Sequence, residues 1–257
     1  MTSNEGYVLI IFRVPMRPGL SQILSYGEYF GRILAAGSIA PEKVFLLYGI
    51  TGRSPASRAR RLESKPEGIF TEPLPEVSLS AREKELLVYP AILFSRGVAA
   101  SNGRQTEAIA AQLASGEPNP VRILKEALKN WDYEPDFPTF TPRISACFTC
   151  AGRLAMSLIR RGENGQSLRD FWPLVLKSNQ GYLLATYNGE NRHPLPPFSG
   201  SPLEFSVQAS TASGLLAEFY PALGPKEGKE DLRVAAAAVI FSLLSLKPTE
   251  IEVINRY

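Results

Sequence analysis

Three arginines near the start of the chain, Arg32, Arg53 and Arg58, have the side-chain chemistry and the spacing that a phosphate site needs. Each lies beside a glycine or serine turn, where the backbone can approach a ligand closely. A guanidinium is planar, permanently charged and able to donate two parallel hydrogen bonds to phosphate oxygens. We therefore expect the three side chains to converge on one cleft that holds a phosphate monoester.

Serines in the turn that carries Arg53 and Arg58 extend the same hypothesis. Ser54 and Ser57 would add hydroxyl groups beside the phosphate or a ribose. The alternative is an ordinary basic surface in contact with water, which is where most arginines of a folded protein lie. We favour that alternative for the two arginines at positions 60 and 61, which follow the turn.

Glu134 is the best candidate for moving a proton. The chain contains one histidine, His193, and it lies in a proline-rich loop. A carboxylate in a loop that prolines make rigid is then the best remaining acid–base group. The alternative is structural, because Glu134 could instead pair with Arg143 in the same loop and fix its shape.

The two cysteines point to packing rather than to a metal or redox site. Cys147 and Cys150 supply only two soft ligands, and with a single histidine in the chain they cannot complete a zinc site of the usual kind. Their Cys-x-x-Cys spacing also lacks the strand–helix context of a thioredoxin-like redox pair. The sequence therefore predicts no metal centre.

Apolar runs predict the strands and helices that must position these groups. Residues 33–50 should form two strands joined by a turn at Pro41, which places the arginines at strand ends. Further strands are expected at 7–14, 86–94, 97–101, 144–149, 153–159, 181–187 and 204–209. Helices are expected at 20–26, 105–114, 119–130, 213–222 and 231–246. Prolines make 133–143 a shaped loop, and 65–75 is expected to be a surface loop.

Length and charge limit the class of protein. At 257 residues the chain can bury one sizeable core, and because no linker or repeat divides it we expect a single domain over 1–257. A net charge of +3 is too small to indicate nucleic acid binding. No apolar run is long enough to span a membrane, and the N-terminus lacks a secretory signal. Together with the two cysteines, these features predict a reducing, cytoplasmic location.

Five motifs follow one another along the chain. They are Tyr-x-Gly-Arg at 29–32, Gly-Arg-Ser-x-x-Ser-Arg at 52–58, Ser-Asn-Gly-x-Gln-Thr at 101–106, Tyr-Glu-Pro-Asp…Thr-Pro-Arg-Ile-Ser at 133–145, and Thr-Tyr…Pro-Leu-Pro-x-Phe-x-Gly at 186–200. Together they resemble the archaeal-type IMP cyclohydrolases and their bacterial IMP cyclohydrolase-like relatives. The motif-bearing core covers 28–207, preceded by an expected N-terminal arm at 1–27 and followed by expected C-terminal helices at 208–257.

The resemblance implies both a fold and a reaction. The fold is α+β, a four-layer αββα sandwich like that of the N-terminal nucleophile hydrolases but without their N-terminal nucleophile. The reaction closes the six-membered ring of 5-formamidoimidazole-4-carboxamide ribotide with loss of water and gives IMP, so the enzyme is a hydrolase of carbon–nitrogen bonds in cyclic amidines. No metal or other cofactor is required. The implied partners are the purine ribotide and, through the family, further copies in a homo-oligomer.

The candidate residues can be matched to this reaction. The catalytic candidates are Glu134, Tyr89 and Tyr133. The phenols of the two tyrosines would donate to the formyl oxygen or stack on the imidazole, and core packing is the alternative for both. The substrate-binding candidates are Arg32, Arg53, Ser54, Arg58, Asn102, Thr106, Arg143 and Tyr187. Asn102 and Thr106 would contact the base edge, unless they serve a turn and a helix cap.

Two positions depart from the family pattern. Pro90 stands where relatives often have asparagine, and it removes a backbone N–H that could contact substrate. Arg104 stands where bacterial relatives tend to have an acid, and it adds positive charge to the expected cleft. Two alternatives to IMP formation therefore stay open: a divergent member that acts on a different heterocyclic amide, and a non-catalytic purine-ribotide-binding protein.

Overall fold

The computed structural model describes residues 17–257. The strand expected at 7–14, and most of the expected N-terminal arm, lie outside the described residues. The remainder of that arm contains the helix α1 (Leu20–Ser25), as the sequence predicted. No helix within 17–257 is long and apolar enough to cross a membrane.

Two antiparallel sheets lie at the centre of the structure. The first has six strands in the order β11 (Leu203–Ser206), β10 (Gln180–Ala185), β1 (Arg32–Ala40), β2 (Lys43–Thr51), β12 (Arg233–Ser242) and β13 (Pro248–Asn255). The second has seven in the order β3 (Arg60–Lys65), β4 (Gly68–Pro73), β5 (Tyr89–Phe94), β6 (Val98–Ser101), β7 (Arg143–Phe148), β8 (Leu154–Arg161) and β9 (Ser167–Leu174). The predicted α+β class is confirmed.

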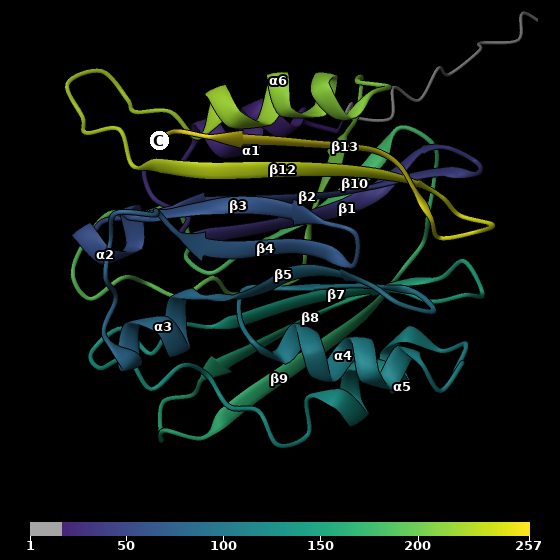
Figure 1. Cartoon of the computed structure of the whole chain (residues 1–257), viewed down its shortest axis with the longest axis horizontal. Coiled ribbons are helices and arrows are strands. Elements are labelled where there is room, and N and C mark those ends of the chain that lie inside the picture. The colour runs from purple at the N-terminus through teal and green to yellow at the C-terminus, as the bar shows by residue number, and fades with distance from the viewer. Residues whose placement is uncertain (1–16) are drawn as a thin grey trace, which may run out of the picture.

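Helices cover the outer faces of the two sheets (Figure 1). On one side, α6 (Ala212–Ala222) packs against β12 and β13, with α1 beside it. On the other side, α4 (Gln105–Leu113) and α5 (Pro120–Ala127) pack against the seven-stranded sheet. The inner faces of the sheets meet in one apolar core. Two short helices, α2 (Pro55–Arg58) and α3 (Ala81–Leu87), lie at the same end of the molecule.

The elements that frame the motifs form as their sequences predict. The hairpin of β1 and β2 turns beside Pro41, and its strands are almost completely buried. Asn119 caps α5, its side-chain oxygen accepting hydrogen bonds from two backbone N–H groups of the first turn. The segment 133–142 has no regular secondary structure, so a shaped loop leads from α5 into β7.

The C-terminal region corrects one expectation. Residues 231–246 were expected to be a helix, but Arg233–Ser242 is the strand β12. Four consecutive alanines favour a helix locally. Here they are completely buried, hydrogen bonded between β2 and β13 and covered by α6, and this tertiary packing outweighs the local preference. Of the expected C-terminal helices, only α6 forms.

A second correction concerns 65–75, which was expected to be a surface loop. Residues 60–73 form the hairpin of β3 and β4, and β3 contacts β12 and β13 of the other sheet. The side-chain amide of Asn255 in β13 bonds both the N–H and the C=O of Leu62 in β3. These long-range contacts turn a polar, weakly patterned segment into a strand.

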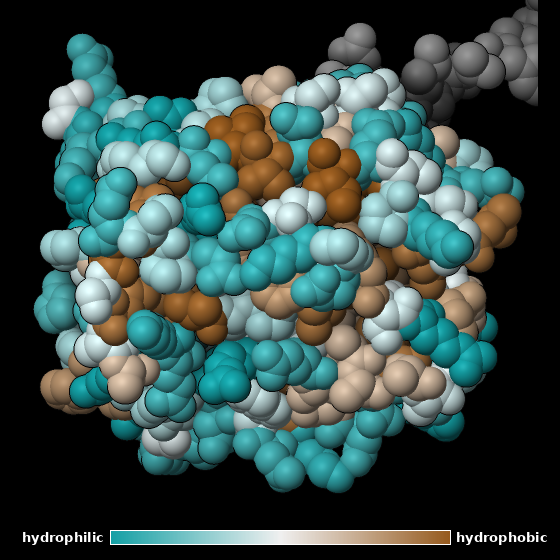
Figure 2. Space-filling view, viewed as in Figure 1, coloured by the Kyte–Doolittle hydropathy of each residue, from teal (hydrophilic) through white to brown (hydrophobic). Residues whose placement is uncertain are grey.

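Hydrophilic side chains cover most of the face seen in Figure 2, with hydrophobic groups scattered between them. The largest exposed apolar side chains include Tyr26, Phe137 and Leu244, which lie far apart in the sequence. Isolated apolar residues of this kind are normal on a protein surface.

Candidate active site

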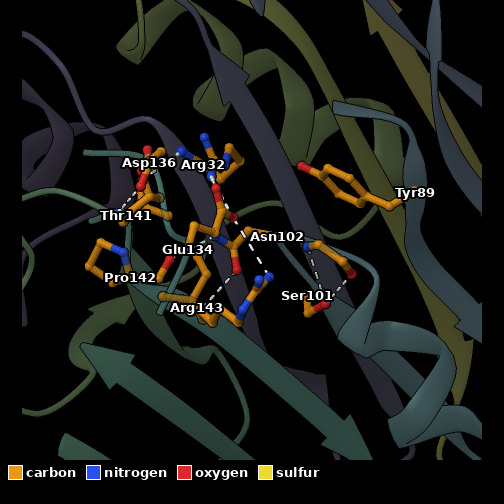
Figure 3. A network of polar contacts seen from close by, with 12 residues as sticks. Arg32, Tyr89, Ser101, Asn102, Glu134, Asp136, Thr141, Pro142 and Arg143 are labelled. Carbon is orange, nitrogen blue, oxygen red and sulfur yellow. Dashed lines mark hydrogen bonds and ion pairs between the residues drawn. The ribbon is translucent and has the colours of Figure 1, made fainter. Parts of the chain in front are cut away.

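Glu134 lies in the loop before β7 and meets Arg32, the first residue of β1 (Figure 3). Nη2 of Arg32 lies 3.1 Å from Oε1 and 3.3 Å from Oε2 of Glu134. Nη1 of Arg143 lies 3.8 Å from the same Oε1. Glu134 is only 4 % exposed. A buried carboxylate thus lies between two guanidiniums, one from each sheet.

The Glu134 loop is held in place by its own hydrogen bonds. The N–H of Glu134 donates to the C=O of Thr141 at 2.9 Å. Thr141 in turn donates its backbone N–H, at 2.6 Å, and its hydroxyl to the carboxylate of Asp136. The loop therefore fixes the position of the Glu134 carboxylate before any ligand binds.

Arg143 is fixed on its other side. Its Nε donates to the C=O of Asp132 at 2.7 Å and its Nη1 to Oε1 of Gln105 at 3.0 Å. Its guanidinium also lies over the ring of Trp131, 5.0 Å from the ring centre. The predicted pairing of Arg143 with Glu134 is therefore present, as one contact within a wider network.

Asn102 and Thr106 lie at the end of β6 and the start of α4, and the chain already uses their polar groups. Asn102 donates to the C=O of Pro142 at 2.8 Å and accepts from the N–H of Ile144 at 2.8 Å. Thr106 hydrogen bonds the hydroxyl of Ser101 and donates to the C=O of Gly103. Asn102 therefore ties the Glu134 loop to β6, and Thr106 closes the turn before α4. Their contact with a base edge stays a prediction.

Two of the three tyrosine candidates lie near Glu134. Tyr89 of β5 hydrogen bonds its hydroxyl to that of Tyr48 of β2 at 2.9 Å, across the space between the sheets. In Figure 3 its hydroxyl points toward Arg32 and Glu134. Tyr187 hydrogen bonds the hydroxyl of Thr141 at 2.7 Å, and burial raises the pKa of its phenol above the usual range.

Tyr133 does not join this group. Its hydroxyl donates to the C=O of Gly165 at 2.8 Å, in the turn between β8 and β9. Its ring packs edge-on against Phe140. Although Tyr133 is adjacent to Glu134 in sequence, the structure directs its side chain to a different part of the surface.

The three arginines that should converge have different surroundings. Arg32 is buried in the site. The guanidinium of Arg53 lies over the ring of Tyr29, 5.3 Å from its centre, and donates to Asn191 and to the C=O of Arg192. Tyr29 stacks on Tyr187 with ring centres 5.6 Å apart. Arg53 therefore reaches the edge of the site through this aromatic pair.

Arg58 is engaged elsewhere. Its Nε donates to the C=O of Gly52 at 3.1 Å, its Nη2 donates to the C=O of Arg53 at 3.1 Å, and its Nη1 pairs with Glu230. Ser54 is the N-cap of α2, accepting a hydrogen bond from the N–H of Ser57 at 3.2 Å. Both residues stabilise their own turn, so the three arginines do not share one partner.

Arg60 was expected to face water, and this expectation is wrong. It is only 1 % exposed and is the largest fully buried side chain of the described residues. Arg61, the next residue, is partly exposed and pairs with Glu63 at 3.2 Å. The signal for this difference is strand alternation, because Arg60 shares a face of β3 with the buried Leu62.

A cavity of about 380 Å³ has Glu134 and Arg143 in its wall. α3, the start of α4 and the ring of Trp131 form much of the remaining wall, which also contains Arg82 and Arg104. The volume is in the range of small-molecule sites. The Glu134 carboxylate is therefore buried beside an opening that a ligand of moderate size could enter.

The electrostatics of Glu134 suit proton transfer. Burial raises the pKa of its carboxyl above the usual range for glutamate, and the charges of Arg32 and Arg143 lower it only in part. A carboxyl with a raised pKa can take up and return a proton nearer neutral pH than a free glutamate. Within residues 17–257, His, Cys, Asp and Glu side chains form no group of three or more that could hold a metal ion.

A protein-family model described as IMP cyclohydrolase-like protein matches residues 29–240. The match covers most of the chain, from Tyr29 to the strand β12, and it includes Glu134 and the two arginines that face it. No curated protein matches the chain.

Proposed function

The chain belongs to the IMP cyclohydrolase-like protein family, as its five motifs predicted, and from this premise we propose that it is a cyclohydrolase of purine synthesis. Its substrate is 5-formamidoimidazole-4-carboxamide ribotide and its products are IMP and water. The observation that carries the proposal is the carboxylate of Glu134, buried between Arg32 and Arg143 beside a cavity. The αββα order of the layers supports a kinship with the N-terminal nucleophile hydrolases.

Ring closure needs one group that moves a proton in both directions. The carboxamide nitrogen attacks the formyl carbon, a carbon–nitrogen bond forms, and the nitrogen loses a proton to the Glu134 carboxylate. Glu134 passes this proton to the formyl oxygen, which becomes the hydroxyl of a carbinolamine. Glu134 then takes the proton of the formamido nitrogen and delivers it to this hydroxyl as the carbon–oxygen bond breaks, so that water leaves and the carbon–nitrogen double bond of the new ring forms. One carboxyl with a raised pKa can serve both steps.

The surrounding groups stabilise the charge that develops on the formyl oxygen. Arg32, Arg143 and the Tyr89 hydroxyl are donors placed before the reaction begins, so little reorganisation is needed. Holding the carboxamide and formyl groups of one molecule close together supplies a further part of the rate enhancement. Tyr187 and Arg53, at the edge of the site, would contact the ring and the sugar-phosphate.

The remaining candidates act through these residues. Asn102, Thr106 and Tyr133 hold the Glu134 loop and its neighbours, because their polar groups bond the chain itself. Ser54 and Arg58 hold the turn that presents Arg53. We assign positioning roles to these five, and the base-edge contact of Asn102 and Thr106 stays a prediction beside this role.

One observation supports the second candidate function, a family member with a different heterocyclic amide as substrate. Arg104, which departs from the family pattern, lies in the wall of the cavity beside Glu134. An added positive charge there would favour a ring substituent that is more acidic than a carboxamide.

An ultraviolet assay of IMP formation, run beside calorimetric binding of IMP, separates the proposals. Turnover supports the cyclohydrolase. Binding without turnover contradicts it and supports a ribotide-binding protein. If neither is observed, both of those functions are excluded and the divergent substrate becomes the better proposal.

A further inference from the structure

Arg60 is a buried cation that the proposed mechanism does not use. It is the first residue of β3, and strand alternation directs its side chain, like that of Leu62, into the space between the sheets. Its Nε donates to the C=O of Ser57 at 3.0 Å. It is the largest of the fully buried side chains among the described residues, so its positive charge lies inside the protein.

The two terminal nitrogens of Arg60 have no hydrogen-bond partner among residues 17–257, and no carboxylate lies within ion-pair distance of it there. Nε of Arg32 is also buried without a partner. A buried charge without a partner costs several kcal/mol, so proteins almost always give it one. A guanidinium whose two terminal nitrogens are both unmet can donate parallel hydrogen bonds to an anion.

The same region carries an excess of positive charge. Burial raises the pKa of the phenols of Tyr29 and Tyr48, and the charges of Arg32 and Arg60 both oppose that rise. These two positive charges therefore act on the same two buried phenols. The opposing charges in this region include Glu134, which Arg32 and Arg143 already hold, and Asp136, which bonds Thr141.

We infer that Arg60 is the phosphate anchor of the site, with Nη1 and Nη2 donating to two oxygens of a phosphate monoester. The ribotide part of this inference rests on the proposed function, but the phosphate part does not. A phosphate monoester carries a charge of about −1.5 to −2 at neutral pH, which balances the excess. In a ribotide whose phosphate is held at Arg60, the ring would extend toward Glu134, the carboxylate partner of Arg32.

An entry route is needed, because both nitrogens of Arg60 are closed from solvent. The guanidinium of Arg53 lies over Tyr29 and is held by two hydrogen bonds to the exposed segment around Asn191 and Arg192. In this proposal the anion enters at this exposed segment, where the two bonds of Arg53 open.

The outer cavity is the competing place for the phosphate. Arg82 and Arg104 line it, but both are exposed, and Glu85 and Glu107 lie in the same wall. Water screens such charges, and the carboxylates offset them. The cavity wall therefore lacks the uncompensated charge that distinguishes the surroundings of Arg60.

The test compares Arg60→Met with its neighbour Arg61→Met in thermal unfolding, with inorganic phosphate or with chloride at equal ionic strength. We expect phosphate to raise the unfolding temperature of the wild type and of Arg61→Met in a saturable way. In Arg60→Met this rise disappears, while the unfolding temperature without phosphate stays equal or increases, because an unpaired buried charge has been removed. An undiminished phosphate effect in Arg60→Met overturns the inference.

A second variant keeps the test decisive if Arg60→Met does not fold. Arg60→Lys retains the charge but loses the two parallel donors, so we expect phosphate and IMP to bind about tenfold to a hundredfold more weakly than to the wild type. Unchanged affinity of Arg60→Lys for both ligands overturns the inference. IMP turnover is measured separately. If the wild type never forms IMP but Arg60→Met loses the phosphate effect, the proposed function alone is contradicted. If the wild type forms IMP and Arg60→Lys does so with an unchanged KM, the phosphate anchor alone is contradicted.

Discussion

Arg58 and Arg60 lie two positions apart and have opposite surroundings. Arg58 bonds two carbonyl oxygens of its own turn and pairs with Glu230, so all of its charge is met by the chain near the surface. Arg60 is buried, and among residues 17–257 its two terminal nitrogens meet no acceptor, although its Nε donates to the C=O of Ser57. Residue type alone therefore does not identify a binding group. A cation whose donors are already used holds structure, and a buried cation whose donors are unused is available to a ligand.

The same contrast separates the two buried arginines of the interior. Arg32 has a carboxylate partner in Glu134 at 3.1 Å, whereas Arg60 has none among the described residues. Arg32 forms an internal ion pair that stabilises the fold, and Arg60 carries a positive charge that an anionic ligand can neutralise. Variants of both regions can test this division.

The largest effect is expected at the centre of the network. Glu134→Gln removes the proton carrier while keeping the size of the side chain, so kcat should fall by about 10²–10⁴-fold with little change in KM. The matched control is Glu227→Gln, at an exposed position before β12, which should leave kcat unchanged. Unchanged turnover in Glu134→Gln, measured by IMP absorbance, would remove Glu134 from proton transfer.

Stability should distinguish the two buried arginines. Arg32→Met leaves Glu134 buried with only Arg143, 3.8 Å away, so the free energy of unfolding should fall by about 3–5 kcal/mol. Arg60→Met removes a charge that has no carboxylate partner among residues 17–257 and should not lower this free energy. Urea unfolding of both variants provides the measurement. Equal losses in the two variants would mean that Arg60 has a structural partner and would contradict the comparison.

Substrate binding should distinguish the two arginines of the turn. Arg53→Ala removes a guanidinium at the edge of the site, and we expect KM to rise about tenfold with kcat nearly unchanged. Arg58→Ala should leave KM within about twofold of the wild type, because Arg58 bonds its own turn. Steady-state kinetics of both variants decide the point, and an equal rise in KM for Arg58→Ala would return it to the site.

The smallest effect is a displacement of the pH profile. If Glu134 acts first as a base, kcat/KM rises with pH as its carboxyl ionises. Arg143→Gln removes a positive charge that favours the ionised form, so the pKa of Glu134 should rise and the midpoint of this limb should move up by about one pH unit. A midpoint that stays in place or moves down would contradict the role of Arg143 as a neighbour of the titrating group.

Many of the strands, helices and loops around the site were predictable because they depend on local sequence patterns. Alternating and continuous apolar runs predict the hairpin of β1 and β2, Asn119 and Pro120 predict the start of α5, and prolines predict the Glu134 loop. The pairing of Glu134 with Arg143 was predicted as an alternative because both lie in one loop. In each case the determining residues are near one another in sequence.

The remaining features depend on contacts that a single sequence does not reveal. Arg32 and Glu134 are 102 positions apart and meet only because β1 and the loop before β7 reach the same end of the two sheets. Arg60 is buried because β3 packs against β12, and β12 was itself expected to be a helix. Because β12 was expected to be a helix, the sequence did not reveal that Arg60 is buried and able to bind an anion.

The most direct test is a crystal structure of the protein with IMP. We expect the phosphate to lie within hydrogen-bonding distance of Nη1 and Nη2 of Arg60 and the purine ring to lie beside Glu134. A phosphate held in the outer cavity by Arg82 and Arg104, or at the turn by Arg58, would contradict this expectation.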